Sequence, residues 1–116
     1  MVHKVNIAEK LARITDYWNP RIAGELNGQE VKLVKFKDEF VWHSHTDADE
    51  LFLVIDGEFT MEFRDHKVLV QANEFIIVPR GVEHKPVAIS EVAVLLFEPK
   101  GTVNTGDEIH ELTRDT

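Results

Sequence analysis

Histidine and glutamate side chains at metal-ligand spacing are the part of this sequence that could do chemistry. His43 and His45 are separated by one residue, Glu50 follows shortly after, and His84 lies in a second segment downstream. Neutral imidazole nitrogens and carboxylate oxygens are ligands that divalent transition ions take in proteins. The pattern therefore predicts one metal site built from two segments, with His43, His45, Glu50 and His84 as its ligands.

Glycine and proline residues stand at turn positions around these candidate ligands. Gly57 follows Glu50, and Pro79 and Gly81 precede His84. An H-x-H pair says little by itself in a chain with six histidines, whereas the joint spacing of both segments is a strong signal. Because proline fixes φ and glycine permits a positive φ, residues 79–81 predict a tight turn that aims His84 at the site.

The composition limits what can surround such a site. With 116 residues, 43% of them hydrophobic, we expect a single domain over residues 1–116 with a real core. The chain has no cysteine, so disulfides, thiolate zinc sites and cysteine nucleophiles are excluded, and any metal must be held by nitrogen and oxygen. A net charge of −8 argues against nucleic acid and anionic membranes as partners and favours a small molecule.

The amino-terminal residues do not resemble a targeting signal. They lack the run of about seven or more apolar residues that a secretory signal needs. No stretch of the sequence approaches the roughly eighteen apolar residues of a membrane-spanning helix. These observations predict a cytoplasmic protein.

The remaining pattern is typical of an all-β fold with one short helix. Asn6 and Glu9 form a helix-capping pattern before an amphipathic segment, which predicts a helix over residues 7–14. Residues 18–29 have a loop-like composition, and Asn27-Gly28 within them is a hairpin turn signal. Evenly spaced runs of Val, Ile and Phe then predict a β-sandwich or barrel over about residues 30–98. The expected strands are 30–36, 39–45, 50–55, 58–64, 66–70, 74–78, 83–89 and 91–98.

Strand parity suggests how this barrel would hold the ligands. Residues two apart face the same side of a strand, so His43 and His45 would both point inward. Glu50 would share its face with Phe52 and Val54, which would place apolar groups beside the metal. Asp56-Gly57 and residues 64–66 are expected to be tight turns. The polar tail, residues 101–116, is expected to pack little and to be mobile or used at an interface.

Other residues near the motifs are interpreted as structural or solvated. Trp42 has the parity opposite to His43 and is expected to be a core or rim aromatic. Three cations could neutralise an anionic substrate, although cations on half-exposed strands are usually just solvated; they are Lys35, Lys37 and Arg80. Three histidines without ligand spacing are expected at the surface; they are His3, His66 and His110. No acid–base partner for the metal is evident from the sequence.

The two segments resemble the two motifs of the cupin family. The first motif, G-x5-H-x-H-x3–4-E-x6-G, is matched at its ligands and last glycine, with Lys37 in place of the leading glycine. The second, G-x5-P-x-G-x2-H-x3-N, is matched at Pro, Gly and His, with Asn73 and Ala88 at the two departing positions. Asn73 tolerates the left-handed conformation that glycine usually supplies there. No metal ligand is lost by these departures.

The resemblance implies a small double-stranded β-helix, the jelly-roll barrel of cupins, with a metal inside one end and with homodimers common. More narrowly, the chain is similar to single-domain cupins described as mannose-6-phosphate-isomerase-like, a label that does not by itself assign that activity. Exposed edge strands of such a barrel would make a homodimer by sheet augmentation reasonable.

The expected ligand set leaves the chemistry open. Three neutral histidines and one carboxylate give a divalent ion a net charge of +1 and, if octahedral, two adjacent open positions for an anionic or sugar-like ligand. Mn, Fe, Ni, Co, Cu and Zn all suit these donors. The leading hypothesis is a metal-dependent enzyme, an oxygenase or an isomerase or lyase, on a small polar metabolite. The alternatives are a non-catalytic module that binds or senses a metal or small ligand, and a barrel in which the ligands serve stability alone.

Overall fold

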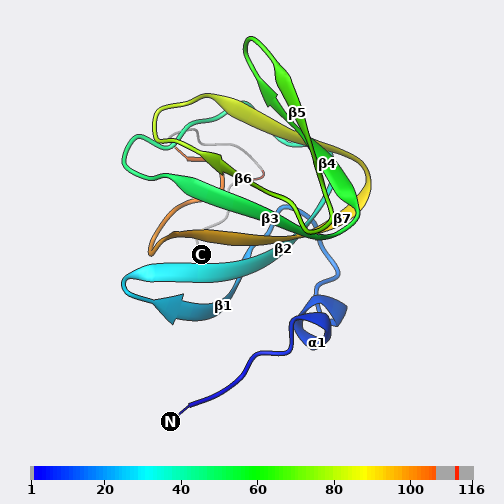
Figure 1. Cartoon of the computed structure of the whole chain (residues 1–116), viewed down its shortest axis with the longest axis vertical. Coiled ribbons are helices and arrows are strands. Elements are labelled where there is room, and N and C mark those ends of the chain that lie inside the picture. The colour runs from blue at the N-terminus through cyan, green and yellow to red at the C-terminus, as the bar shows by residue number, and fades with distance from the viewer. Residues whose placement is uncertain (1, 107–111, 113–116) are drawn as a thin grey trace.

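The chain folds into antiparallel β-structure with one short helix (Figure 1). A computed structural model describes residues 2–106 and residue 112. Within these residues all strand pairs are antiparallel, which confirms the all-β jelly-roll prediction. In chain order the elements are α1 (Ile7–Ala12), β1 (Arg21–Leu26), β2 (Gln29–Glu39), β3 (Glu50–Asp56), β4 (Glu58–Phe63), β5 (Lys67–Gln71), β6 (Phe75–Val78) and β7 (His84–Pro99).

Strand β7 joins the two halves of the fold. Residues 93–97 of β7 lie between β2 and β3, and residues 84–87 pair with β4. Strands β1, β6 and β5 extend the sheet beyond β2, β3 and β4, respectively. Figure 1 shows β4 and β5 lying over the layer that β1, β2, β3 and β6 form with β7. One continuous strand therefore carries His84 at one end and Glu98 near the other.

Alternating apolar residues fill the space between the layers. Each fully buried aliphatic or aromatic side chain contributes roughly 1.5–3 kcal/mol by leaving water. On β4, the buried side chains of Phe59 and Met61 alternate with less buried neighbours. The core cluster consists of Trp18, Val34, Phe36, Phe40, Phe52, Val54, Phe59, Met61, Val70, Val78, Ala88, Val92, Val94 and Leu96.

The amino-terminal helix is shorter than predicted. The Asn6 side-chain oxygen accepts a hydrogen bond from the Glu9 backbone N–H at 3.0 Å, as the capping pattern indicates. The helix ends at Ala12 and none of its residues is buried, whereas Ile14 beyond it is. Ile14 thus contributes to the core after the chain has left the helix. Among the described residues, no helix is both long and apolar enough to span a bilayer.

The hairpin at Asn27-Gly28 is confirmed, but part of the loop predicted before it is wrong. Asn27 and Gly28 have φ values of 51° and 77°, as a tight two-residue turn between β1 and β2 requires. Strand β1 lies within residues 18–29, which we expected to form a loop. This strand pairs only with β2, so it lacks the alternating burial that a sequence pattern reveals.

The strand boundaries around the predicted site also differ. Residues 39–45 do not form the expected strand, because β2 ends at Glu39. A bulge before Asp38, which has a φ of 67°, shifts the register between β2 and β7 just before this end. Only His43 in the following segment makes a β-bridge. The two expected strands 83–89 and 91–98 are instead the single strand β7.

The two predicted tight turns have different roles. Residues 64–66 join β4 and β5, which pair, and the Phe63 N–H donates to the His66 carbonyl at 2.8 Å. Gly57 joins β3 and β4, which do not pair with each other, so this connection carries the chain between layers and is not a hairpin. Its φ of 92° is positive, in keeping with glycine at this position of the motif.

Candidate metal centre

Hydrogen bonds to the backbone position two of the four candidate ligands, His43 and His84. His43 and His84 form a β-bridge in which each backbone N–H donates to the other residue's carbonyl, at 3.0 and 2.9 Å. The Nδ1 atom of each ring lies 2.9 Å from the carbonyl oxygen two residues earlier, that of Val41 or Val82. Because a carbonyl only accepts, Nδ1 must carry the proton, which leaves the Nε2 lone pair available to a metal.

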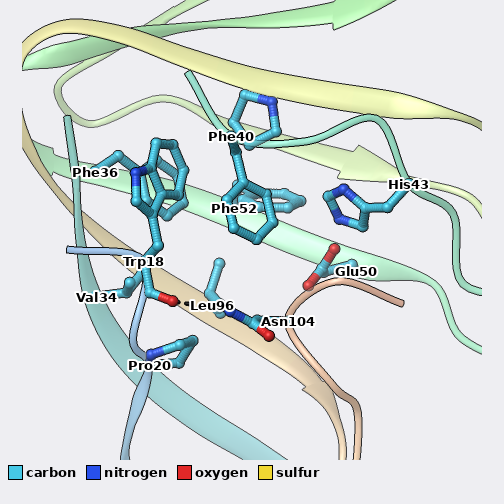
Figure 2. A pocket seen from close by; sticks show the side chains of 11 residues that line it. Trp18, Pro20, Val34, Phe36, Phe40, His43, Glu50, Phe52, Leu96 and Asn104 are labelled. Atoms are coloured by element: carbon cyan, nitrogen blue, oxygen red, sulfur yellow. Dashed lines mark hydrogen bonds between the residues drawn. The ribbon is translucent and has the colours of Figure 1, made fainter. Parts of the chain in front are cut away.

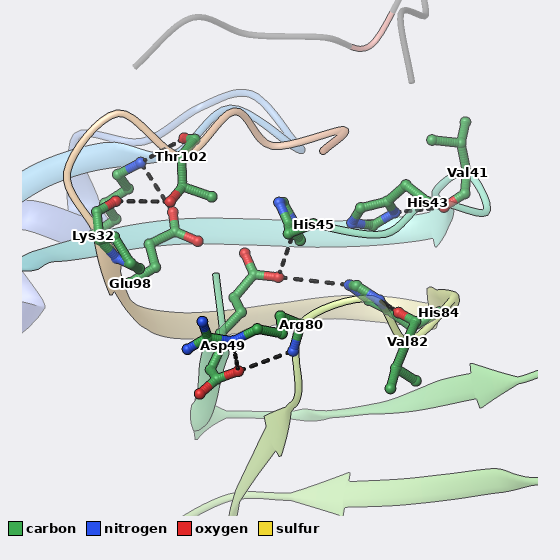
Figure 3. A network of polar contacts seen from close by, with 12 residues as sticks. Lys32, Val41, His43, His45, Asp49, Arg80, Val82, His84, Glu98 and Thr102 are labelled. Carbon is green, nitrogen blue, oxygen red and sulfur yellow. Dashed lines mark hydrogen bonds and ion pairs between the residues drawn. The ribbon is translucent and has the colours of Figure 1, made fainter. Parts of the chain in front are cut away.

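His45 lies near these two histidines (Figure 3), and Glu50 completes a compact group with them. Glu50 begins β3, and its Oε1 lies 3.1 Å from Nε2 of His45 and 3.5 Å from Nε2 of His84. All four side chains are buried, and one ligand atom from each lies within 4.8 Å of the others. The structure therefore brings together all four residues predicted from the sequence.

Three of the facing atoms lack the partners that buried polar atoms normally have. Nε2 of His45, Oε1 of Glu50 and Nε2 of His84 are buried without a hydrogen bond. Leaving such atoms unsatisfied costs about 1–3 kcal/mol each. A cation bound between them would satisfy all three, so the donor set fits the divalent ion that the sequence predicts. These four residues could therefore hold a metal ion.

The electrostatics of the site also suit metal binding. Burial, followed by the neighbouring His84, lowers the pKa of His43 to about 4, so its imidazole is neutral at neutral pH. Burial alone would raise the pKa of Glu50, but contacts from Glu98, His45 and His84 outweigh it and hold the pKa of that carboxyl well below its usual range. A neutral imidazole and an ionised carboxylate are the forms that coordinate a divalent ion.

The predicted turn before His84 is present and is tied to the first segment. Gly81 has a φ of 80°, and its N–H donates to the His45 carbonyl at 2.8 Å. The Asp49 carboxylate accepts from the Arg80 backbone N–H at 2.9 Å and from its Nε at 3.3 Å. Asn73 has a φ of 69°, as its place in the motif requires. These contacts fix the two ligand-bearing segments against each other.

A buried charged cluster beside the ligands was missed from the sequence. Lys32 Nζ lies 2.9 Å from Glu98 Oε1 and 3.9 Å from Glu30 Oε1, and it donates to the Thr102 carbonyl at 3.1 Å. Burial and the adjacent Glu50 raise the pKa of Glu98 to about 9. Glu98 is therefore a protonated carboxyl in contact with a predicted ligand, and it is the acid–base candidate that the sequence analysis lacked.

The alternation of inward and outward residues along the strands could have revealed this cluster. Glu30 and Lys32 alternate with outward residues in phase with Val34 on β2, and Glu98 follows Leu96 in the same phase on β7. Charged residues at core positions are unusual unless they are paired. Their placement at inward positions near the end of the barrel could therefore have been read as part of the site.

The start of the carboxyl-terminal tail packs against the barrel, which corrects the expectation for this segment. Thr105 is fully buried, and Asn104 Nδ2 donates to the Trp18 carbonyl at 2.8 Å. A Cβ on Gly106 would lie 2.0 Å from the Ser44 carbonyl oxygen and 3.3 Å from His45 Nδ1, so only glycine permits this approach. Residues 107–111 and 113–116 of the tail lie outside the described residues.

A mostly apolar cavity borders two of the ligands (Figure 2). His43 and Glu50 form one side of it, and Asn104 is its other polar residue. The remaining residues are Trp18, Pro20, Val34, Phe36, Phe40, Phe52, Pro86 and Leu96. A more polar cavity of about 350 Å³ borders His45 between residues 45–48 and 99–106.

The other residues considered in the sequence are not part of the ligand group. Trp42 is half-buried beneath the Arg64 guanidinium, 3.9 Å from its ring centre, in keeping with a structural role. Lys35 donates to the Ile14 carbonyl, and neither it, Lys37 nor Arg80 borders the apolar cavity. His3 and His66 are exposed, whereas His110 lies outside the described residues.

A jelly-roll barrel with a buried cluster of three histidines and one glutamate defines a class of small β-proteins with a candidate metal centre. The family model described as Cupin domain matches residues 29–99, and the chain belongs to this family. This result confirms the resemblance predicted from the two motifs.

Similar proteins agree with the family assignment. The chain is 36% identical over 77 residues to the uncharacterized protein YdbB of Bacillus subtilis (strain 168), which covers 66% of this chain and 68% of that protein. It resembles the crystal structure of a cupin-2 domain containing protein from Shewanella frigidimarina NCIMB 400, with 42% identity, a TM-score of 0.81 and coverage of 83% and 94% of the two chains. Protein NMB1881 from Neisseria meningitidis is similar at 27% identity and a TM-score of 0.78, with coverage of 84% and 100%.

Proposed function

We propose that this chain is a metal-dependent enzyme that binds one divalent transition ion through His43, His45, Glu50 and His84 and acts on a small metabolite bound at that ion. The observation that carries the proposal is the convergence of buried, unsatisfied ligand atoms from both motif segments. The ion would be Mn, Fe, Ni, Co, Cu or Zn, because only nitrogen and oxygen donors are offered.

Such an ion, when bound, supplies Lewis-acid chemistry at a substrate oxygen or, if it is redox-active, supports oxidation. The protein's own groups have separate tasks. The Val41 and Val82 carbonyls keep the rings of His43 and His84 in one tautomer and orientation. The aromatic side chains of the apolar cavity exclude water beside Glu50, which strengthens electrostatic interactions there.

Glu98 favours an enzyme over a non-catalytic binding module. A module that only senses a metal or stores a ligand needs no group that holds a proton at the site. Glu98 is a buried carboxyl beside Glu50, and in the metal-free protein burial and this neighbour raise its pKa, so it is placed to hold or transfer a proton at the site. The reaction is therefore proposed to include proton transfer or oxidation at the bound metabolite, as in an oxygenase, isomerase or lyase. Mannose-6-phosphate isomerisation itself is not proposed.

Elemental analysis of the purified protein tests the proposal. We expect about one equivalent of a transition metal in the native protein and none in the triple variant His43→Ala, His45→Ala, His84→Ala. The variant His66→Ala is the matched control, because this histidine is exposed and is not part of the ligand group, and it should retain the metal. Absence of metal from the native protein after reconstitution at neutral pH would overturn the proposal.

The identity of the metal decides the assay that follows. Iron would direct the search to oxygen uptake, and manganese, nickel or zinc to isomerase and lyase assays. The variant Glu98→Gln keeps a similar shape but loses the carboxyl, so we expect it to retain the metal and to lose turnover. Turnover unaffected by Glu98→Gln would remove the acid–base role, and ligand binding without any turnover would support the binding module.

A cytoplasmic location and a homodimer stay predictions of the same proposal. Strand β6 lies at one end of the sheet, and its outward residues Phe75 and Ile77 are exposed, which supports association between copies. Sedimentation of the purified protein at micromolar concentration would distinguish a dimer from a monomer.

A further inference from the structure

The outer face of the layer formed by β2, β7, β3 and β6 is lined by apolar side chains. Residues that are paired across an antiparallel sheet point to the same side of it, and the register of these strands aligns two complete rows. The first row is Val31, Phe97, Leu51 and Ile77, and the second is Leu33, Leu95, Leu53 and Phe75. Core residues such as Phe52, Val78 and Leu96 alternate with them along the strands, so both rows face away from the core.

The two ends of these rows have opposite shapes. At the β6 end, the side chains of Phe75 and Ile77 project into solvent and are 61% and 52% exposed. At the β2 end, the amino-terminal segment lies against the sheet and leaves an apolar groove of about 220 Å³. The groove is lined by Val5, Ile7, Ala23, Gly24, Val31, Leu33 and Leu95. Figure 1 shows this segment and α1 on the side of β1 and β2 that faces away from β4 and β5. The face therefore carries a projecting aromatic ring and a groove without charged walls.

Such a face is complementary to itself. The strand order β2-β7-β3-β6 places the groove and the projecting ring on the two outer strands, each next to one of the central strands β7 and β3. A two-fold axis that runs along the strands between two facing sheets, over the boundary of β7 and β3, exchanges the positions of β2 and β6. Phe75 of each copy then meets the groove of the other copy, and the contact occurs twice. The groove is larger than the roughly 150 Å³ of an apolar cavity that holds benzene, so it can take a phenyl ring.

The charge and the size of the face also favour a second copy as its partner. None of the eight residues in the two rows is charged, so two chains that each carry a net charge of −8 can meet here without placing carboxylates in contact. The five strands from β1 to β6 span roughly 24 Å, and five residues along each strand span roughly 17 Å. This flat area of about 400 Å², which projecting side chains increase, is comparable to the roughly 800 Å² per partner of a stable interface.

We propose that two copies of this chain associate through these outer faces, with Phe75 of each copy in the groove of the other. The sheets pack face to face, about 10 Å apart and with their strands nearly aligned. This arrangement differs from the pairing of edge strands that the sequence predicts, because side chains and not the β6 backbone make the contact. The inference goes beyond the proposed metal-dependent function, since the face lies outside the barrel and contains none of the candidate ligands.

Sedimentation of the purified protein over a range of concentrations tests this inference. We expect a dimer at micromolar concentration. The variant Phe75→Glu places a carboxylate in the apolar groove twice per dimer, so the Kd of the dimer should rise at least about 100-fold. Leu69→Glu is the matched control, because Leu69 is 51% exposed on β5, which belongs to the other layer. Both variants add the same negative charge, and Leu69→Glu should leave the Kd unchanged.

Cross-linking locates the contact within the dimer. The chain has no cysteine, so introduced thiols react without a background. In a mixture of the variants Phe75→Cys and Ile7→Cys, we expect a short bismaleimide to link one chain of each kind, which mass spectrometry identifies. Phe75→Cys alone should stay unlinked, because the two β6 strands of the proposed dimer lie roughly 14 Å apart across the face. Both positions are exposed, so neither substitution disturbs the core.

The outcomes separate the possible arrangements. A protein that sediments as a monomer at micromolar concentration would overturn the inference. A dimer that Phe75→Glu and Leu69→Glu weaken equally would overturn it as well, because the outer face would then have no special part in association. Links between two chains of Phe75→Cys, without links in the mixture, would show pairing of β6 edges in place of facing sheets. Mixed links together with selective loss of the dimer in Phe75→Glu would establish the proposed interface.

Discussion

From the contacts of Lys32 in the buried cluster we predict how much the substitution Lys32→Met lowers the free energy of unfolding. Its side chain is 0% exposed, and its ammonium contacts the Glu98 carboxyl and the Thr102 carbonyl. The substitution Lys32→Met removes the charge while keeping an unbranched side chain. The carboxyl oxygens of Glu98 and Glu30 then remain buried without the ammonium beside them. Leaving these two buried groups unsatisfied costs about 2–6 kcal/mol, at about 1–3 kcal/mol each.

The loss should be large relative to the stability of a small domain. A domain of this size typically unfolds with a free energy of about 5–15 kcal/mol. With a urea dependence of about 2 kcal/mol/M, a loss of about 4 kcal/mol lowers the midpoint by roughly 2 M. Urea titration of the metal-free protein, followed by tryptophan fluorescence and circular dichroism, measures this shift.

Two further variants show whether the carboxyl groups left without a partner are the cause. The double variant Lys32→Met, Glu98→Met replaces both partners by apolar groups, so we expect it to recover at least about 2 kcal/mol relative to Lys32→Met alone. The variant Lys67→Met removes a cation that is 69% exposed and 3.6 Å from Glu62, and it should change the free energy of unfolding by less than about 1 kcal/mol. The reasoning is refuted if Lys32→Met costs less than about 1 kcal/mol, or if the double variant loses the sum of the two single effects.

Two other predictions concern the metal-free protein. On folding, the pKa of His43 falls from its usual 6.5 to about 4, so as the pH falls His43 is protonated first in the unfolded chain. The contribution of His43 to the free energy of unfolding is therefore complete above pH 6.5 and is lost as the pH falls toward 4. The expected loss is about 3 kcal/mol. It is measured in urea titrations across this pH range as the difference between the native protein and His43→Asn, because the opposite effect of Glu98 is present in both proteins and cancels. Parallel pH profiles of the two proteins would contradict the prediction. Gly57→Ala should destabilise by about 2 kcal/mol or more in thermal unfolding, because φ is 92° and the added Cβ would meet the Glu91 carbonyl oxygen at 3.0 Å. Gly24→Ala, with nothing within 4 Å of its Cβ, is the matched control, and an equal loss in both variants would rule out this explanation.

The four candidate ligands could be predicted because metal coordination constrains residue type and spacing together. His43, His45, Glu50 and His84 all lie where the motifs placed them, although residues 39–45 are not a strand. The motif predicted which residues come together, whereas the local path of the chain depends on a bulge at Asp38 and on contacts with distant segments. A sequence pattern carries no direct record of such contacts.

The apolar cavity and the tail depend on packing contacts that the sequence pattern did not predict. Trp18 was assigned to a loop, and its stacking on Phe36 and Phe40 depends on segments that only the fold brings together. The polar composition of residues 101–106 suggested little packing, yet Thr105 is buried and Asn104 is hydrogen-bonded to the Trp18 backbone. Small polar residues can close a barrel when their hydrogen bonds are satisfied, and composition does not reveal this.

The position of β7 has a consequence for how the protein is made. Strands β2, β3 and β4 all pair with β7, which runs from His84 to Pro99. During synthesis these earlier strands leave the ribosome without their shared partner, and loop-closure entropy opposes contacts between such distant segments. The barrel can therefore assemble only when nearly all of its residues have been translated. Because His84 and Glu98 arrive with that same strand, a nascent chain carries only part of the candidate ligand set, and the proposed metal would bind only after translation of the barrel.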